Sequence, residues 1–133
     1  CTPELLAATP PPGRPPDETP QQLFTVLGQA FASGDEETLF QRLHPLVLTR
    51  YGVDQCRAYL ASLQVPNYAV EVLTVGNPEP WDWTLDGRTD RLGDAIPVGI
   101  RYTDDGTSYR ETDAHVVRVD GQLRWFTDCG TPI

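Results

Sequence analysis

The chain has 133 residues, enough for one domain with a single hydrophobic core and too few for two. Its 19 acidic residues outnumber 10 basic ones, and the net charge of −9 argues against nucleic-acid binding and against a polybasic membrane surface. No apolar run reaches the roughly 18 residues that a membrane-spanning helix needs. Every basic residue is Arg and Met is absent, a bias that indicates a G+C-rich bacterial genome.

Residues 1–18 have the composition of a flexible tether. Seven of the 13 prolines lie in the first 20 residues, and a run such as Pro10–Pro16 can form neither helix nor sheet, because proline fixes φ and lacks an N–H donor. We expect this segment to pack on nothing. A leading cysteine before such a spacer resembles a mature bacterial lipoprotein, so Cys1 is a predicted lipid attachment site. That lipid would be the only membrane contact of a protein exported to the outer face of the cell membrane; the alternatives are secretion without a lipid, or a frayed terminus with no role.

The first helix is predicted to begin at Thr19, with Pro20 in its first position and Gln22 completing a capping box. Ser33 and Gly34 end it. One face of this helix is apolar, as expected for a helix that covers a core. The residues on this face are Leu23, Phe24, Leu27, Ala30 and Phe31.

Two further helices are predicted before residue 66. Asp35 caps a short second helix that has Arg42 in its last turn and ends at Pro45. An extended segment is expected over Leu46–Tyr51. The third helix then presents one apolar side, which consists of Val53, Cys56, Leu60 and Leu63.

Beyond residue 66 the hydrophobic period becomes two, which indicates strands. The expected strands are Tyr68–Val75, Trp81–Leu85, Ala95–Thr103, Thr107–Val119 and Leu123–Asp128. Asp86-Gly87, Asp105-Gly106 and Asp120-Gly121 separate them, the last two as tight hairpins. Helices followed by an antiparallel meander predict one α+β domain over residues 19–133, with the helices on the concave face of a curved sheet.

Three segments resemble the nuclear transport factor 2-like superfamily, whose members share a cystatin-like α+β cone. Residues 34–45 (GDEETLFQRLHP) are similar to its second helix and following turn, and residues 51–60 (YGVDQCRAYL) to the start of its third helix. Residues 116–126 (VVRVDGQLRWF) resemble the end of its meander. The superfamily includes isomerases, dehydratases and cyclases as well as non-catalytic binding domains, so the fold alone does not define a function. Leu46 stands where enzymatic members often carry an acidic residue.

The resemblance also bears on the cysteines. If Cys1 carries lipid, Cys56 and Cys129 remain as a pair, either bonded or as two buried thiols. In the superfamily's topology, the strand before the third helix runs beside the last strand. This arrangement implies that Cys56 and Cys129 meet in a disulfide.

Candidates for catalysis are few. Asp113 and His115 share a strand face and could form an acid–base couple, although a solvated strand face has the same pattern. His44 is interpreted mainly as a helix C-terminal cap, and Asp82 as an outward polar residue. Asp86, Asp90 and Asp94 lack the spacing of a calcium loop, and no zinc or nucleotide motif is present, so no metal or cofactor is expected.

The concave side is predicted to be nearly filled, leaving at most a small apolar cavity. Asp113 and His115 are then expected to point towards solvent or the convex face. The sequence therefore favours a non-catalytic binding or interaction domain over an isomerase- or dehydratase-type enzyme that uses this pair. A small apolar ligand, an envelope protein and a second copy of the chain all stay open as partners. The candidate pocket residues are Phe31, Leu60, Trp83, Tyr102 and Trp125.

Overall fold

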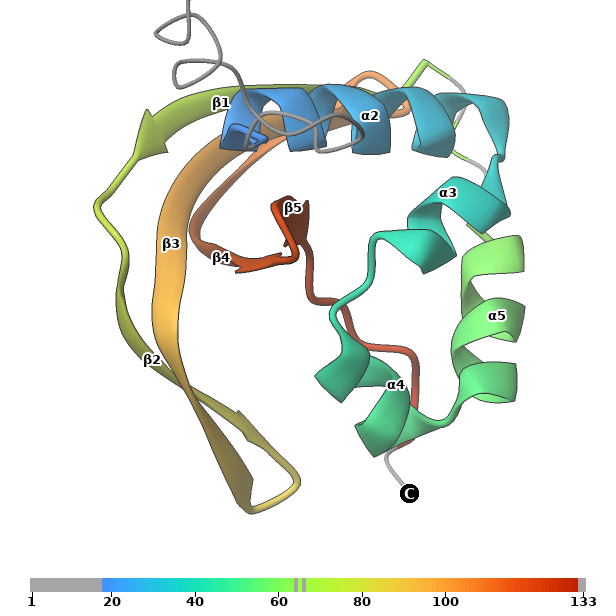
Figure 1. Ribbon diagram of the computed structural model, residues 1–133. Helices are drawn as coiled ribbons and strands as arrows, with labels where there is room; N and C mark the ends of the chain where they lie inside the picture. Colours follow the sequence, from blue (N-terminus) through green and yellow to red (C-terminus); the bar gives the residue numbers. More distant parts are fainter. Residues whose placement is uncertain (1–17, 64, 66, 132–133) are drawn as a thin grey trace, which may run out of the picture.

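Four helices pack on a curved antiparallel sheet of five strands in the computed structural model, which describes residues 18–63, 65 and 67–131 (Figure 1). The helices are α2 (Pro20–Ser33), α3 (Glu36–Gln41), α4 (Pro45–Tyr51) and α5 (Val53–Ala61). The strands are β1 (Ala69–Val75), β2 (Glu79–Leu85), β3 (Arg88–Asp104), β4 (Thr107–Val119) and β5 (Gln122–Arg124). The predicted α+β class is confirmed. Cys1 and the rest of the predicted tether up to residue 17 lie outside the described residues. Among those described, no helix has the length and apolarity to cross a membrane.

Helix α2 begins as its sequence predicts. The Thr19 hydroxyl accepts a hydrogen bond from the Gln22 N–H at 3.2 Å, and the Gln22 side chain accepts one from the Thr19 N–H at 2.8 Å. Gly34 ends the helix in the left-handed conformation, with φ of 71°. Gly28 lets the helix approach the sheet, since a Cβ there would lie 2.9 Å from Cγ1 of Val70 on β1.

The segment predicted to be extended, Leu46–Tyr51, is instead part of helix α4, and that prediction was wrong. Pro45 is the first residue of this helix, where its missing N–H costs nothing, and His44 caps it. Val47, Arg50 and Tyr51 are buried, which is a helical spacing that the β-branched and aromatic content of the segment concealed. His44 thus caps the start of α4 rather than the end of the helix before it.

The long strand β3 organises the sheet. It pairs with β4 along one edge and with β2 and then β1 along the other, so the order is β1-β3-β4-β5 with β2 beside β3. Pro97 lies where the second edge changes partner, and its carbonyl accepts a hydrogen bond from Gly76 at 2.9 Å. All three Asp-Gly pairs form two-residue hairpins with positive φ at both positions, Asp86-Gly87 included.

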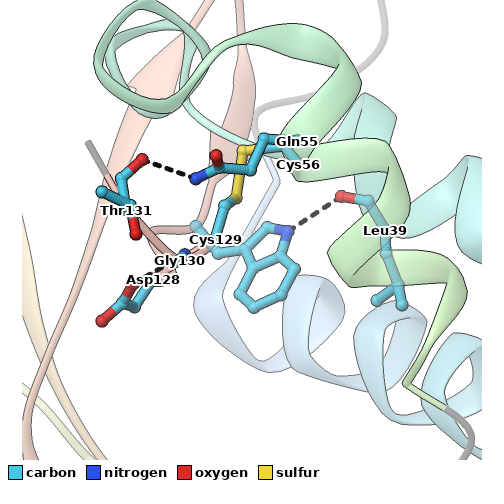
Figure 2. Close-up of a disulfide and its surroundings, with 8 residues drawn as sticks. Leu39, Gln55, Cys56, Asp128, Cys129, Gly130 and Thr131 are labelled. Atoms are coloured by element: carbon cyan, nitrogen blue, oxygen red, sulfur yellow. Dashed lines mark hydrogen bonds between the residues drawn. A yellow bond between two sulfur atoms is a disulfide. The ribbon is translucent and has the colours of Figure 1, made fainter. Parts of the chain in front are cut away.

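The chain after β5 leaves the sheet and joins the helices. The last strand ends at Arg124, short of the predicted Asp128, because Trp125 forms a parallel bridge with Leu43. Farther along, Cys129 is disulfide-bonded to Cys56 of α5 with a Cα separation of 4.9 Å, as expected (Figure 2). The Gln55 side chain also donates to the Thr131 carbonyl at 2.7 Å. The core lies between this segment, the helices and the inner side of β3 and β4.

Glu18, which composition assigns to the tether, is bound into the fold. Its carboxylate accepts hydrogen bonds from the Arg42 guanidinium at 2.6 and 2.8 Å and from the Leu123 N–H at 2.9 Å. Its main chain bonds to Gly121 and to the Arg118 side chain. Its carboxylate therefore joins the segment after α3 to strand β5.

We expect a chain that begins at Glu18 to keep its thermal midpoint within about 2 °C of the full chain.

Glu18→Ala in the full chain should instead lower the free energy of unfolding by about 2 kcal/mol. The substitution leaves the partly buried Arg42 guanidinium and the Leu123 N–H without their hydrogen-bond acceptor. Thermal and urea unfolding measure the effects of the truncation and of the substitution, with Glu36→Ala at an exposed helix position as the control. A Glu18→Ala variant as stable as the control would contradict the assigned role of the carboxylate.

The disulfide closes a loop with a sequence separation of 73. Replacing Cys56 and Cys129 together by Ser should therefore lower the free energy of unfolding by on the order of 4 kcal/mol, the chain-entropy estimate for a loop of this size. Urea unfolding measures the loss, and the wild-type protein treated with a reductant serves as the control. A loss below about 1 kcal/mol in both samples would show that contacts alone hold the C-terminal segment.

Candidate functional site

A cavity of about 720 Å³ lies between α2, α5 and the strands β3 and β4. This volume is within the range of small-molecule sites. The expectation of at most a small cavity was therefore wrong. Its apolar lining comes from helices, strands and the C-terminal segment alike, and includes Leu27, Phe31, Tyr59, Tyr68, Ile100 and Trp125.

The cavity stays open because the apolar row of β3 is divided between two environments. Ile96 and Val98 are buried in the core away from the cavity lining, whereas Ile100, which belongs to the same core, and the partly buried Tyr102 line the cavity. The rings around the cavity contact their neighbours: Phe31 lies 4.9 Å from Tyr68, which lies 6.1 Å from Tyr102. The aromatic side chains thus form walls around the space rather than filling it.

Three of the five predicted pocket residues line the cavity, namely Phe31, Tyr102 and Trp125. The other two lie elsewhere. Leu60 is buried in the core at 1% exposure. The Trp83 ring packs 5.2 Å from Phe126 and lies below the Arg50 guanidinium at 5.7 Å. Leu60 and Trp83 therefore support the structure around the cavity without lining it.

Asp113 and His115 both contribute to the cavity lining, although the Asp113 side chain is exposed to solvent, as expected. They do not form an acid–base couple, however. Nδ1 of His115 lies 2.9 Å from the main-chain carbonyl of Asp113, and a carbonyl can only accept, so Nδ1 carries the proton. The Asp113 side chain is exposed, and the main-chain N–H of Asp113 donates a hydrogen bond to the Glu111 carboxylate at 2.9 Å.

Four aromatic rings in contact with one another connect His115 to the start of α4. Its imidazole lies parallel to Trp81 at 4.2 Å, and Trp81 meets Phe126 edge-on at 5.0 Å. Phe126 in turn stacks on His44 at 4.8 Å. These contacts link β4, β2, the C-terminal segment and the start of α4, so His115 has a fixed position at the cavity wall.

His44 is a structural group in this arrangement. Its Nδ1 accepts a hydrogen bond from the Leu46 N–H at 3.1 Å and so caps helix α4. Burial, and secondarily the positive charge of Arg124, lowers the pKa of the His44 imidazole below its ordinary value. The neutral form is thereby favoured, as the cap requires.

The charged groups of the cavity are all acidic. Asp104, Glu111 and Asp113 contribute to its lining, and no Arg does among the described residues. Burial, together with the neighbouring Tyr102 and Asp104, raises the pKa of Tyr68 to about 12. Tyr68 therefore stays protonated at neutral pH and adds no negative charge.

Asp82 and Asp90, two other acidic residues of the sequence, have structural partners. Asp82 is exposed and pairs with Arg91 at 3.0 Å, as predicted for an outward residue. Asp90 pairs with the buried Arg50 of α4, and this ion pair joins the β2–β3 hairpin to the helices. Within the described parts of the chain, no cluster of three or more His, Cys, Asp or Glu side chains could hold a metal ion.

Sequence reasoning missed several residues of the cavity, including Tyr68, Trp81, Glu111 and Phe126. For Glu111 a signal existed: it follows Tyr109 at the two-residue period of β4 and pairs with Ile100 of the apolar row. Tyr68 and Phe126 were predicted within strands, but in the structure they lie just outside β1 and β5, so the alternation of a strand does not place their side chains. No family model, curated protein or solved structure matches the chain. The geometry itself must indicate what the cavity does.

The His44 cap makes stability depend on pH. Below an ordinary histidine pKa of about 6.5, the unfolded chain takes up a proton that folded His44 resists, so the free energy of unfolding should fall as the pH drops from 7 to about 5. His44→Asn retains a capping oxygen but cannot titrate, so its slope over this interval should be smaller. Urea unfolding at several pH values measures this slope in both proteins. Equal slopes would contradict the role given to His44.

Proposed function

We propose that this protein is a non-catalytic binding domain that holds a small, mainly apolar ligand in the cavity. The observation that carries the proposal is a cavity of about 720 Å³ with aromatic and aliphatic walls. Burial of apolar ligand surface would supply the affinity. The few polar groups at its lining would orient the ligand.

The absence of a paired catalytic base supports binding over catalysis. A dehydratase-type site needs a histidine paired with a carboxylate, and an isomerase-type site needs a positioned carboxylate base with oxyanion donors. Here His115 bonds to a main-chain carbonyl, and the Asp113 side chain is exposed. Nothing pairs these two side chains as proton transfer would require.

We further propose that the chain is a nuclear transport factor 2-like domain that works outside the cytoplasm. The first part is supported by helices before a curved antiparallel meander and by the parallel bridge of Leu43 with Trp125. The second is supported by the Cys56–Cys129 disulfide, since such bonds persist in oxidising compartments. Mass spectrometry of the protein from its native membrane fraction would test lipid attachment at Cys1.

Binding can be tested with a neutral probe, 4-phenylbutan-1-ol, titrated into ¹⁵N-labelled protein. The amide signals of Tyr102, Glu111 and His115 should shift in a saturable manner. Ala114→Phe places a ring in the cavity lining and should abolish these shifts, whereas Ala69→Phe at an exposed strand position should not. Shifts that map outside the cavity, or that survive Ala114→Phe in a folded protein, would overturn the proposal.

One observation favours a second function, an isomerase-type enzyme. With its proton on Nδ1, His115 has a free lone pair on Nε2, and its ring lines the cavity. The test is conversion of 3-cyclohexenone, a β,γ-unsaturated ketone, to its conjugated isomer, followed by ultraviolet absorbance. The binding proposal expects the buffer rate. An acceleration that His115→Gln removes would establish the enzyme instead.

A further inference from the structure

Charge is distributed unequally between the cavity and the rest of the molecule. The chain contains no Lys, and five arginines of the described residues form ion pairs: Arg42, Arg50, Arg57, Arg91 and Arg101. None of the residues that line the cavity in the described chain is Arg, whereas three are carboxylates. The cavity therefore has a negative potential that no neighbouring cation lining it offsets.

The carboxylates are placed along one side of the cavity by the strand period. Ile100, Tyr102 and Asp104 alternate on β3 and share a face, and Glu111 on β4 pairs directly with Ile100. The Glu111 carboxylate is held in place because it accepts the Asp113 N–H at 2.9 Å. An acidic side thus borders the aromatic wall of Tyr68 and Tyr102, whose rings are 6.1 Å apart.

Aromatic faces and carboxylates attract the same kind of ligand. The face of an aromatic ring is electron-rich and binds ammonium groups, and a carboxylate adds a direct attraction. Phe31, Tyr68, Tyr102 and Trp125 supply ring surface beside Asp104 and Glu111. A carboxylate ligand would meet like charge in this cavity, and a neutral ligand would gain only from apolar burial.

We propose that the cavity selects an organic cation, an alkyl- or arylammonium compound, over neutral and anionic molecules of the same skeleton. This inference rests on the proposed ligand-binding function and adds the charge class of the ligand. The ammonium group lies beside Asp104, which shares a strand face with Tyr102, and the apolar part lies against the aromatic wall. Glu111 pairs with Ile100, four positions from Asp104 along β3, and adds to the negative potential of the cavity.

The experiment compares three probes of one skeleton by NMR titration: 4-phenylbutylamine, 4-phenylbutan-1-ol and 4-phenylbutanoate. The amine should bind about tenfold more tightly than the alcohol, with the carboxylate weakest. Ionic strength near 0.15 M limits the general attraction of a chain with net charge −9, because the screening length is then about 8 Å.

Two matched double variants locate the selectivity. Asp104→Asn with Glu111→Gln keeps the shape and the acceptor for the Asp113 N–H, and should reduce the amine's advantage over the alcohol to within about twofold. Glu36→Gln with Asp54→Asn changes the net charge equally at exposed helix positions and should leave the advantage intact. An amine advantage that both variants reduce equally would assign it to net charge and refute the inference.

The remaining outcomes separate this inference from the proposed function. If the alcohol binds in the cavity and the amine binds no better, cation selectivity is wrong and the binding function stands. If none of the three probes shifts the cavity signals, both fail. If the carboxylate binds most tightly, the negative side of the cavity does not face the ligand and the inference is overturned.

Discussion

The pairing of Trp125 with the segment around Leu43 is the constraint on which the rest of the structure depends. The Trp125 N–H donates to the Arg42 carbonyl and its carbonyl accepts from the His44 N–H, both at 2.9 Å, while the indole N–H donates to Leu39 at 3.0 Å. These bonds attach the end of a five-stranded sheet to the connection between two helices. They also turn the Trp125 ring towards Phe31, so one residue both closes the fold and forms a wall of the cavity.

The neighbouring contacts follow from that attachment. Once Trp125 is fixed, Phe126 lies against His44, and Cys129 comes within disulfide distance of Cys56 on α5. The same segment therefore fixes α4 through a ring stack and α5 through a covalent bond. The cavity lies beside this C-terminal segment. Aromatic residues contact one another along the cavity wall and leave the space between α2 and the sheet unfilled.

Arginine and carboxylate side chains have separate tasks in this protein. Arg42 and Arg50 have structural roles, because they form ion pairs with Glu18 and Asp90 that connect elements far apart in the chain. Such partly buried pairs are costly to break, because either partner alone would be left desolvated. Since the described arginines lie away from the cavity lining, Asp104 and Glu111 face it without a basic neighbour in that lining. The acidity of the site is thus a consequence of where the basic residues are used.

The α+β class follows from the order of the predicted elements along the chain, and the sequence by itself also determined two local features, the capping box of Thr19 and Gln22 and the Asp-Gly hairpins. Each local feature depends on residues within a few positions of one another. The disulfide needed the topology of a resembling family as well. Only the tertiary structure decided that residues 46–51 are helical, that Glu18 belongs to the fold and that the concave side holds a cavity. The reason is that these features depend on distant partners; the Glu18 carboxylate and the Leu123 N–H are 105 positions apart, a distance that no local pattern spans.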